Sequence, residues 1–146
     1  MITCELARNE QYEELMALMM HEGDYLTETL RLMKITEGEF DHLFRTIGRV
    51  YCIYSDMQLA GFYWVEEREK TLHLHAIIVK TEFQGKGTGT RILNNLTKQP
   101  NRSINMIELG VHESNLGAIR MYERNGFKTV EKLDDVKFLI MRKQVH

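Results

Sequence analysis

Three glycines at every second position, Gly85, Gly87 and Gly89, form the segment of the chain best suited to bind a ligand. Glycine lets a backbone turn tightly and bring successive N–H groups to face one point. An apolar run at 72–79 precedes the glycines, and apolar residues at helical spacing follow over 92–96. The run is therefore expected to be a strand, and the loop is expected to open a helix. The loop amides and the positive end of that helix predict a site for an anion, most naturally a phosphate.

Two well-known phosphate-binding loops do not describe this segment. The nucleoside-triphosphate loop ends in Gly-Lys-Ser/Thr, whereas Lys86 here precedes Gly87 and Thr88. The dinucleotide fingerprint Gly-x-Gly-x-x-Gly opens an early βαβ unit, whereas these glycines lie in mid-chain with one residue between them. Nucleotide binding therefore ranks last among the functions considered.

His73 and His75 are the residues of the apolar run that could move a proton. Alternate side chains of a strand share a face, which puts both histidines on one side together with Ile77 and Val79. A histidine titrates near ~6.5 and is mostly neutral at pH 7, so it can accept a proton. A pair of hydrogen-bonded histidines in a half-buried strand is an equally good interpretation. The remaining histidines have no spacing that argues for a metal: His21, His42, His112 and His146.

Composition narrows the classes of function. A chain of 146 residues can bury a core, and its formal net charge of -2 gives no field that would attract nucleic acid or an anionic membrane. The chain opens with no charged and apolar leader, and no apolar run approaches the ~18 residues of a membrane span. Cys4 and Cys52 are isolated in strand-like runs, as expected for reduced thiols. These features predict a cytoplasmic protein without a nucleic-acid or membrane partner.

Hydrophobic periodicity predicts one α/β domain over residues 1–146, without repeats or a linker. Strands are expected at 2–7, 50–55, 59–65, 72–79, 104–111, 127–133 and 136–141. The polar run at 66–70 is expected to be a solvated turn, and the last two strands are expected to form a hairpin around Asp134 and Asp135. Capping and stop signals predict four helices: from Asn9 to Gly23, from a capping box at Thr36–Glu39 to Gly48, from the glycine loop to before Pro100, and from Ser114 or Asn115 to Gly126. The spacing of Leu26, Leu30 and Met33 suggests a further helix after Gly23.

A second motif downstream makes the glycine loop more specific. It reads Asn115-Leu-Gly-Ala118-Ile-Arg-Met-Tyr122-Glu-Arg-Asn-Gly126-Phe127. Together with Gln84-x-x-Gly87-x-Gly89, it resembles the acetyl-coenzyme A signature of the GNAT N-acetyltransferase superfamily. The two motifs cover roughly the C-terminal half, and the N-terminal half matches in its order of elements. The resemblance implies a mixed, mostly antiparallel sheet of six or seven strands with about four helices, whose central strands splay to form the coenzyme cleft.

The resemblance also implies roles for individual residues. The signature that begins at Gln84 would bind the pyrophosphate through the amides of Gly85, Lys86, Gly87, Thr88 and Gly89. The backbone of Ile77 and Val79 would pair with the pantetheine arm, and the Val79 amide could polarise the thioester carbonyl. Asn115 would hydrogen-bond that arm. Tyr122 would lie near the sulfur, where a phenol can protonate or hydrogen-bond the leaving thiolate. The structural alternatives are a helix cap for Asn115 and a core residue for Tyr122.

The general base has several candidates. An aliphatic amine with a pKa near ~10.4 must lose a proton, at a cost of roughly 4–5 kcal/mol at pH 7, and a base reached through water assists this step. In several family members the base is a glutamate on the strand before the Asn-containing helix, at a position that matches Gly110 here. Glu108, on the same strand face, could substitute. The favoured choice is His75 with His73 as relay, since this His-x-His is similar to that of arylalkylamine N-acetyltransferases.

The sequence therefore predicts an N-acetyltransferase that moves an acetyl group from acetyl-CoA to a primary amine by direct transfer in a ternary complex, without a metal. The acceptor would be a small molecule or a peptide. The alternative is a non-catalytic acyl-CoA-binding module that senses or scaffolds. The acceptor pocket is expected from 23–47 and the closing hairpin. The acidic residues Glu22, Asp24 and Glu28 would suit a cationic amine. A homodimer is one of the assemblies that the sequence leaves open.

Overall fold

The computed structural model of the chain describes residues 1–22, 24–98 and 101–145, so the predicted breaks at Gly23 and Pro100 lie outside the described residues. The chain forms two compact units. Unit 1 comprises Met1–Val65 and Ala76–Thr88, and unit 2 comprises Glu66–His75 and Gly89–His146. Strands β3 (Gln58–Arg68) and β4 (Thr71–Val79) each have residues in both units. A single domain over 1–146 stays a prediction.

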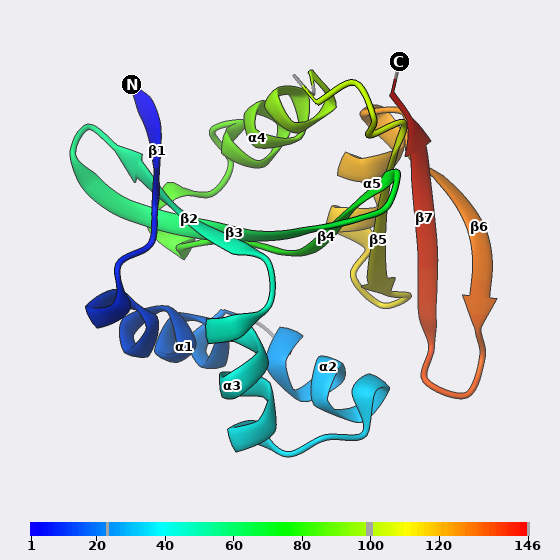
Figure 1. Ribbon diagram of the computed structural model, residues 1–146, viewed down its shortest axis with the longest axis horizontal. Coiled ribbons are helices and arrows are strands. Elements are labelled where there is room, and N and C mark those ends of the chain that lie inside the picture. Colours follow the sequence, from blue (N-terminus) through cyan, green and yellow to red (C-terminus); the bar gives the residue numbers. More distant parts are fainter. Residues whose placement is uncertain (23, 99–100, 146) are drawn as a thin grey trace. The chain divides into compact units, whose positions relative to one another are not determined.

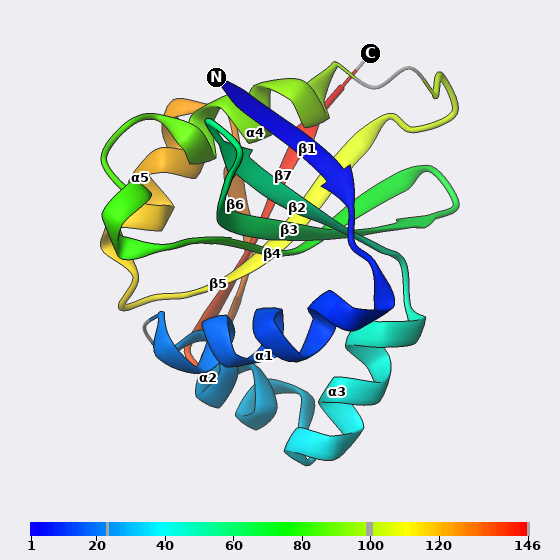
Figure 2. The same cartoon turned by 90° about the vertical axis from the view of Figure 1, so that its left-hand side faces the viewer.

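Unit 1 combines antiparallel strands with three α-helices. β1 (Ile2–Leu6) pairs antiparallel with β2 (Arg49–Ser55), and β2 pairs antiparallel with β3. The helices α1 (Tyr12–His21), α2 (Tyr25–Met33) and α3 (Glu37–Thr46) lie together on one side of β1 and β2 (Figures 1 and 2). Two short 3-10 turns, η1 (Asn9–Gln11) and η2 (Thr81–Phe83), also belong to this unit.

Aromatic side chains from α3 and β3 form the centre of the core of unit 1. The ring of Phe44 lies 5.1 Å from that of Trp64 and 5.5 Å from that of Phe62, measured between centroids. Phe40 packs edge-on against Trp64 at 5.7 Å. The indole N–H of Trp64 donates to the carbonyl of Ile47 at the end of α3 (2.8 Å). Aromatic side chains of α3 therefore pack directly on β3, and the indole satisfies the carbonyl of Ile47, the residue just after the last residue of the helix.

Unit 2 consists of the end of β3 (from Glu66) and the first part of β4 (to His75), together with three further strands and two helices. The strands are β5 (Met106–His112), β6 (Lys128–Leu133) and β7 (Phe138–Gln144), and the helices are α4 (Thr88–Thr97, from Gly89 onward) and α5 (Leu116–Arg124). β4 pairs in parallel with β5 from Thr71↔Met106 to Leu74↔Leu109. β5 pairs antiparallel with β7, and β7 forms the closing hairpin with β6 (Figure 1). Ile92, Leu93, Ile107 and Phe127 are fully or almost fully buried in the core of this unit.

The strand order confirms the predicted fold class. Over the described residues, the strands hydrogen-bond in the order β1-β2-β3-β4-β5-β7-β6, which is a seven-stranded mixed sheet. The pairing of β4 with β5 is parallel, whereas β1–β2, β2–β3, β5–β7 and β6–β7 are antiparallel. Five α-helices occur in the described part of the chain, where about four were expected. The splayed cleft stays a prediction.

Two predicted boundaries near strand and helix ends are wrong. Asn9 begins a 3-10 turn that follows Arg8, and the N-cap of α1 is Gln11, whose side chain makes no capping hydrogen bond to the helix. The side chain of Gln11 instead accepts from the amide of Arg8 (2.9 Å). The closing hairpin turns over 134–137 rather than at two aspartates, because the turn continues to Lys137, which takes positive φ (60°) before β7 begins at Phe138.

The polar run at 66–70 is also not a simple solvated turn. β3 continues to Arg68, and the turn is confined to Glu69, with positive φ (54°), and Lys70. Glu66 is only 19% exposed, because its carboxylate is engaged by neighbouring side chains in unit 2. This correction brings a charged residue into the candidate site.

Gly61 in β3 makes a testable contribution to unit 1. A Cβ atom at this position would overlap the carbonyl oxygen of Ile78 and lie 2.9 Å from the Cα atom of Val79. Because backbone atoms cannot move aside easily, we expect Gly61→Ala to lower the free energy of unfolding by about 2 kcal/mol or more in urea denaturation. Gly38→Ala is the control, since its nearest neighbour, Thr36 Oγ1, lies 4.0 Å away. It should be neutral or stabilise α3 by up to about 1 kcal/mol, and equal stability of the two variants would contradict the close approach.

Candidate functional site

The glycine loop of unit 1 has the backbone conformation expected for an anion-binding loop. Gly85 and Gly87 have positive φ (75° and 77°), whereas Lys86 between them does not. Alternation of this kind turns successive N–H groups toward a common concavity. Among the described residues, the amides of these three residues have no backbone hydrogen-bond partner. A Cβ at either glycine would meet no atom within 4 Å, so conformation rather than space requires glycine.

Side-chain hydrogen bonds in unit 1 hold the start of this loop. Glu22 accepts from the amide of Thr81 (3.1 Å) and from its hydroxyl (3.0 Å). The side-chain amide of Gln84 donates to the carbonyl of Val79 (2.8 Å), which closes the loop back onto β4. Glu22 therefore serves the loop, although the sequence suggested it for a cationic acceptor. A contact of Gln84 with the coenzyme stays a prediction.

Side chains alternate along β4 as predicted. One face is buried and consists of Leu72, Leu74, Ala76 and Ile78. The other face is half-buried and consists of Thr71, His73, His75, Ile77 and Val79. The two histidines therefore share a face with the two residues whose backbone is predicted to pair with pantetheine. Within unit 2 the histidine rings are nearly parallel, with 6.4 Å between centroids and 22° between planes.

His75 is held by a carboxylate from β3. Its Nε2 lies 2.8 Å from Oε1 of Glu66, and the same oxygen accepts from Nη2 of Arg68 at 2.8 Å. The side chains of His75 and Glu66 are 25% and 19% exposed. A half-buried carboxylate is costly unless it is paired, and here the arginine and the imidazole share that role.

His73 has a similar arrangement with partners from β5 and β7. Its Nδ1 lies 3.3 Å from Oε1 of Glu108, whose Oε2 accepts from Nε of Arg142 at 2.6 Å. The strand register explains the arrangement, since His73 is paired with Glu108 and Glu108 with Arg142. Both carboxylate oxygens of Glu108 are thus engaged. Gly110, two residues further along β5, carries no side chain that could act as a base.

Burial lowers the pKa of both histidines. For His75, desolvation outweighs the opposing effect of the hydrogen bond with Glu66. For His73, desolvation is again the largest cause, Arg68 lowers the pKa further, and Glu108 opposes both. The hydrogen bond from Arg68 holds the pKa of Glu66 below its usual value. Both rings are therefore neutral at pH 7, which is the state in which an imidazole can accept a proton.

Asn115 and Tyr122 lie at the start and near the end of α5 in unit 2. Oδ1 of Asn115 accepts from the amide of Ala118 (3.2 Å), so its predicted role as helix cap is confirmed. Tyr122 is 9% exposed and packs edge-on against Phe127, with 5.8 Å between ring centroids. Burial raises the pKa of Tyr122 to about 12, so the phenol keeps its proton at physiological pH. Gly126, with φ of 92°, ends the helix as predicted.

Gly89 differs from the other two glycines of the loop. It lies in the first turn of α4 and does not take positive φ. A Cβ there would lie 2.8 Å from Sδ of Met121 on α5, a residue of the same unit. Close packing of two helices therefore accounts for this glycine, a reason that the sequence motif does not reveal.

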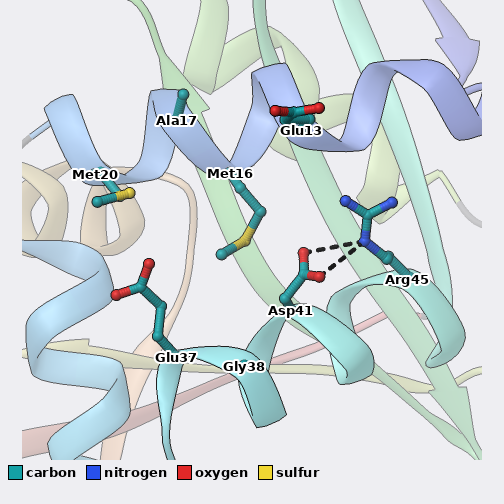
Figure 3. Close-up of a pocket in the computed structure, with 8 residues that line it drawn as sticks. All are labelled: Glu13, Met16, Ala17, Met20, Glu37, Gly38, Asp41 and Arg45. Atoms are coloured by element: carbon teal, nitrogen blue, oxygen red, sulfur yellow. Dashed lines mark hydrogen bonds and ion pairs between the residues drawn. The ribbon is translucent and has the colours of Figure 1, made fainter.

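An open groove of about 450 Å³ lies between α1 and α3 in unit 1 (Figure 3). Its lining residues are Glu13, Met16, Ala17, Met20, Glu37, Gly38, Asp41 and Arg45. Nε of Arg45 donates to both carboxylate oxygens of Asp41 (3.0 Å each) at one end of the groove. Half of the lining comes from the segment 23–47 that was expected to contribute to the acceptor pocket. None of the lining residues is a predicted coenzyme-binding or catalytic residue, so the groove does not locate the acceptor.

Other features expected from composition can be compared with the structure. Cys4 and Cys52 are free thiols. Within residues 1–22, 24–98 and 101–145, no three His, Cys, Asp or Glu side chains form a group that could hold a metal ion. Within the same residues, no helix has the length and apolar character needed to cross a membrane.

Comparison with known proteins decides the family. A sequence profile described as the Acetyltransferase (GNAT) family matches residues 8–127, which include both the glycine loop and the motif on α5. The chain belongs to the GNAT acetyltransferase family. The family resemblance inferred from the two motifs is therefore confirmed, and it extends well into the N-terminal half.

Two curated relatives of this GNAT chain are named as uncharacterised N-acetyltransferases. MJ1207 of Methanocaldococcus jannaschii is 34% identical over 71 residues, which cover 47% of this chain and 31% of that protein. YvbK of Bacillus subtilis is 29% identical over 94 residues, which cover 63% of this chain and 60% of that protein. The GNAT chain thus matches less than two thirds of the length of either relative.

Solved structures share the fold of the GNAT chain. The spermidine N-acetyltransferase from Vibrio cholerae, solved in complex with CoA and spermine, superimposes with a TM-score of 0.77. The match covers 98% of this chain and 95% of the Vibrio chain at 17% sequence identity. At this level of identity the similarity concerns the fold alone.

Three residues that surround the candidate histidines of the GNAT chain were not found from the sequence: Glu66, Arg68 and Arg142. Trp64 and Val65 are both buried, so strict alternation fails in β3 just before Glu66. Alternation alone could not have placed Glu66 beside His75. Arg142 reaches Glu108 across 34 residues of sequence, and only the register of β5 with β7 brings them together.

The lowered pKa values of His73 and His75 predict that the stability of the GNAT chain depends on pH. Because their pKa values are lowered in the folded state, the unfolded chain binds protons first as the pH falls below about 6.5. We therefore expect the free energy of unfolding to decrease from about pH 6.5 to about pH 5.5 in urea denaturation. Above about pH 7 both states hold neutral rings, and this contribution to stability is fully present.

A double variant, His73→Gln with His75→Gln, should have a flatter dependence in that window. Glu66 does not interfere, because its pKa is lowered from 4.5 and its titration lies at more acidic pH. His42→Gln serves as the control, since this side chain is exposed on α3. If the double variant kept the slope of the parent chain, the neutral-histidine interpretation would be wrong.

Proposed function

We propose that this chain is an acetyl-CoA-dependent N-acetyltransferase that acetylates a primary amine of a small molecule or peptide by direct transfer in a ternary complex. The observation that carries the proposal is the GNAT family match over 8–127, which includes the glycine loop and the motif from Asn115 to Tyr122. The proposal places the reaction in the cytoplasm and leaves a homodimer open.

The coenzyme is bound mainly by main-chain groups in this proposal. The pyrophosphate accepts hydrogen bonds from the amides of Gly85 to Thr88, with Gly89 at the start of α4. The positive φ of Gly85 and Gly87 supports this assignment. The backbone of Ile77 and Val79 pairs with the pantetheine arm, and Asn115 hydrogen-bonds the same arm.

In the reaction, the amine nitrogen attacks the thioester carbonyl carbon. A carbon–nitrogen bond forms, the carbon–sulfur bond breaks, and the products are the N-acetyl amine and free CoA thiol. The Val79 amide donates to the oxygen on which negative charge develops. The proton lost from the amine goes to the general base, and the thiolate takes up a proton, so the reaction is balanced.

His75 is the proposed general base, with His73 as relay. Its neutral state at pH 7 and its place on the half-buried face of β4 support this role. Glu108 is the weaker candidate, since both of its carboxylate oxygens are already engaged by His73 and Arg142. We therefore assign Glu108 to the orientation of His73.

Tyr122 is the proposed hydrogen-bond donor to the departing sulfur. Its pKa of about 12 is well above that of an ordinary thiol, near ~8.5, so a complete proton transfer from phenol to thiolate is unfavourable. A strong hydrogen bond to the developing thiolate is the role that this pKa supports. The final proton then comes from solvent or from the base.

The acceptor is proposed to be an amine. The structural neighbour from Vibrio cholerae is named as a spermidine N-acetyltransferase and was solved with spermine, an example of this class of substrate in the same fold. A screen of diamines, polyamines, aminoglycosides and peptides, with detection of free thiol, would identify the acceptor.

The catalytic assignment can be tested with the acceptor that gives the highest rate in that screen. We expect His75→Gln to lower kcat by about 100-fold or more, because the general base is lost. We expect Tyr122→Phe to lower kcat by about 10-fold, because one hydrogen bond to the leaving group is lost. Calorimetry should find the Kd for acetyl-CoA within about threefold of the parent value in both variants.

His42→Gln provides the control for the histidine, because this exposed residue on α3 has no assigned role. Coenzyme binding without acceptor-dependent release of thiol from any amine would favour the non-catalytic sensor or scaffold. Binding of ATP but not acetyl-CoA would instead support a nucleotide-binding protein.

The glycine loop can be tested separately. Gly87→Ala adds a methyl group at a φ of 77° and should distort the loop. We expect the Kd for acetyl-CoA to rise about 10-fold, equivalent to about 1.4 kcal/mol. Gly48→Ala is the matched control, because Gly48 has a similar φ of 66° at the end of α3. Both variants should lose a similar amount of stability, and an equal loss of coenzyme affinity in both would refute the assignment.

A further inference from the structure

We propose that Glu66 and Arg68 are positioning residues that set which nitrogen of His75 accepts the proton and keep its ring neutral. This inference rests on the proposed function, in which His75 is the general base. Neither residue belongs to the motifs of the glycine loop or α5, and both lie on β3 beyond the predicted end of that strand.

The geometry fixes the tautomer of His75. An ionised carboxylate can only accept hydrogen bonds, so the contact of 2.8 Å between Glu66 Oε1 and His75 Nε2 requires a hydrogen on Nε2. In a neutral ring the lone pair is then on Nδ1, which becomes the basic nitrogen. When Nδ1 takes a proton from the amine, the imidazolium keeps its hydrogen bond from Nε2 to Glu66, and the carboxylate stabilises the new charge.

A carboxylate that orients a histidine also stabilises the protonated form of the ring. An unbalanced negative charge within hydrogen-bond distance favours the imidazolium form and raises the pKa of the imidazole. Arg68 prevents this, because its guanidinium contacts the same oxygen of Glu66 at 2.8 Å. The imidazole therefore faces a neutral ion pair rather than a lone anion, which allows orientation without permanent protonation.

The charged groups that act on the two histidines are also balanced. His75 is influenced by Glu66 and Arg68 from β3 and by His73 from β4. His73 is influenced in addition by Glu108 from β5 and Arg142 from β7. Two carboxylates are thus matched by two guanidinium groups, and desolvation is the largest cause that lowers the pKa of His75.

His73 repeats the arrangement with the other ring nitrogen. Its Nδ1 faces Glu108 at 3.3 Å, and Glu108 is balanced by Arg142 at 2.6 Å. This longer contact is an ion pair only when His73 is protonated, and it does not set the tautomer of His73 as the hydrogen bond of Glu66 sets that of His75. Each histidine is nevertheless backed by a carboxylate and an arginine.

The test measures the pKa and tautomer of His75 by NMR of ring ¹⁵N and ¹³C nuclei in the full chain without ligands. In the parent chain we expect the Nε2–H tautomer and a pKa below 6.5. Arg68→Gln should move the pKa upward, because Glu66 loses its balancing charge. Glu66→Gln should move it downward and mix the two tautomers. Arg45→Gln is the matched control, because it removes an arginine from an ion pair with Asp41 on α3.

Kinetics give the second readout. In Arg68→Gln, kcat at about pH 6 should fall several-fold relative to the parent chain, while kcat at about pH 8 should change by less than about twofold. Arg68→Lys retains the charge and should restore both the pKa and the pH profile. If Arg68→Gln does not fold, as judged by circular dichroism, Arg68→Lys and Glu66→Gln still decide the question through the NMR measurement.

The two proposals can fail separately. If the parent chain acetylates an amine but His75 has the same pKa and tautomer in the parent, Arg68→Gln and Glu66→Gln, the positioning role is refuted and the proposed function stands. If no amine is acetylated while the NMR shifts follow the expected directions, the proposed function is refuted and the electrostatic arrangement is supported.

Discussion

The alternation of side chains along β4 is the constraint on which most of the described structure depends. The buried face of this strand contributes Leu72 to unit 2 and Ile78 to unit 1, and the half-buried face carries both histidines. A shift of one residue would exchange the two faces, exposing the apolar side chains and burying the imidazoles. The close approach of Gly61 to Ile78 and the parallel register with β5 both oppose such a shift.

The polar groups on the half-buried face show how unit 2 accommodates charge away from bulk water. Each histidine contacts one carboxylate, and each carboxylate contacts one arginine. Isolated charges at such exposure would be costly, whereas paired charges with hydrogen bonds are tolerated. The gain in stability from partly exposed ion pairs is small, which is consistent with the proposed role of these pairs in orienting the imidazoles.

Local physical rules predicted much of the fold and part of the site. The capping box of α3, the cap at Asn115, the left-handed stop at Gly126 and the two faces of β4 all depend on residues close in sequence. The partners of the histidines could not be predicted in this way. They depend on strand register over long separations and on the two consecutive buried residues that interrupt alternation in β3.

Tryptophan occurs once in the chain, at Trp64, and its burial in the aromatic core of unit 1 has an experimental consequence. Fluorescence excited at the indole band reports on the surroundings of this one side chain, whereas far-ultraviolet circular dichroism averages over the helices and strands of both units. Coincident melting curves from the two signals would indicate one cooperative transition, and separated curves would indicate stepwise loss of structure. The unmodified polypeptide thus carries a built-in reporter for the cooperativity between its two units.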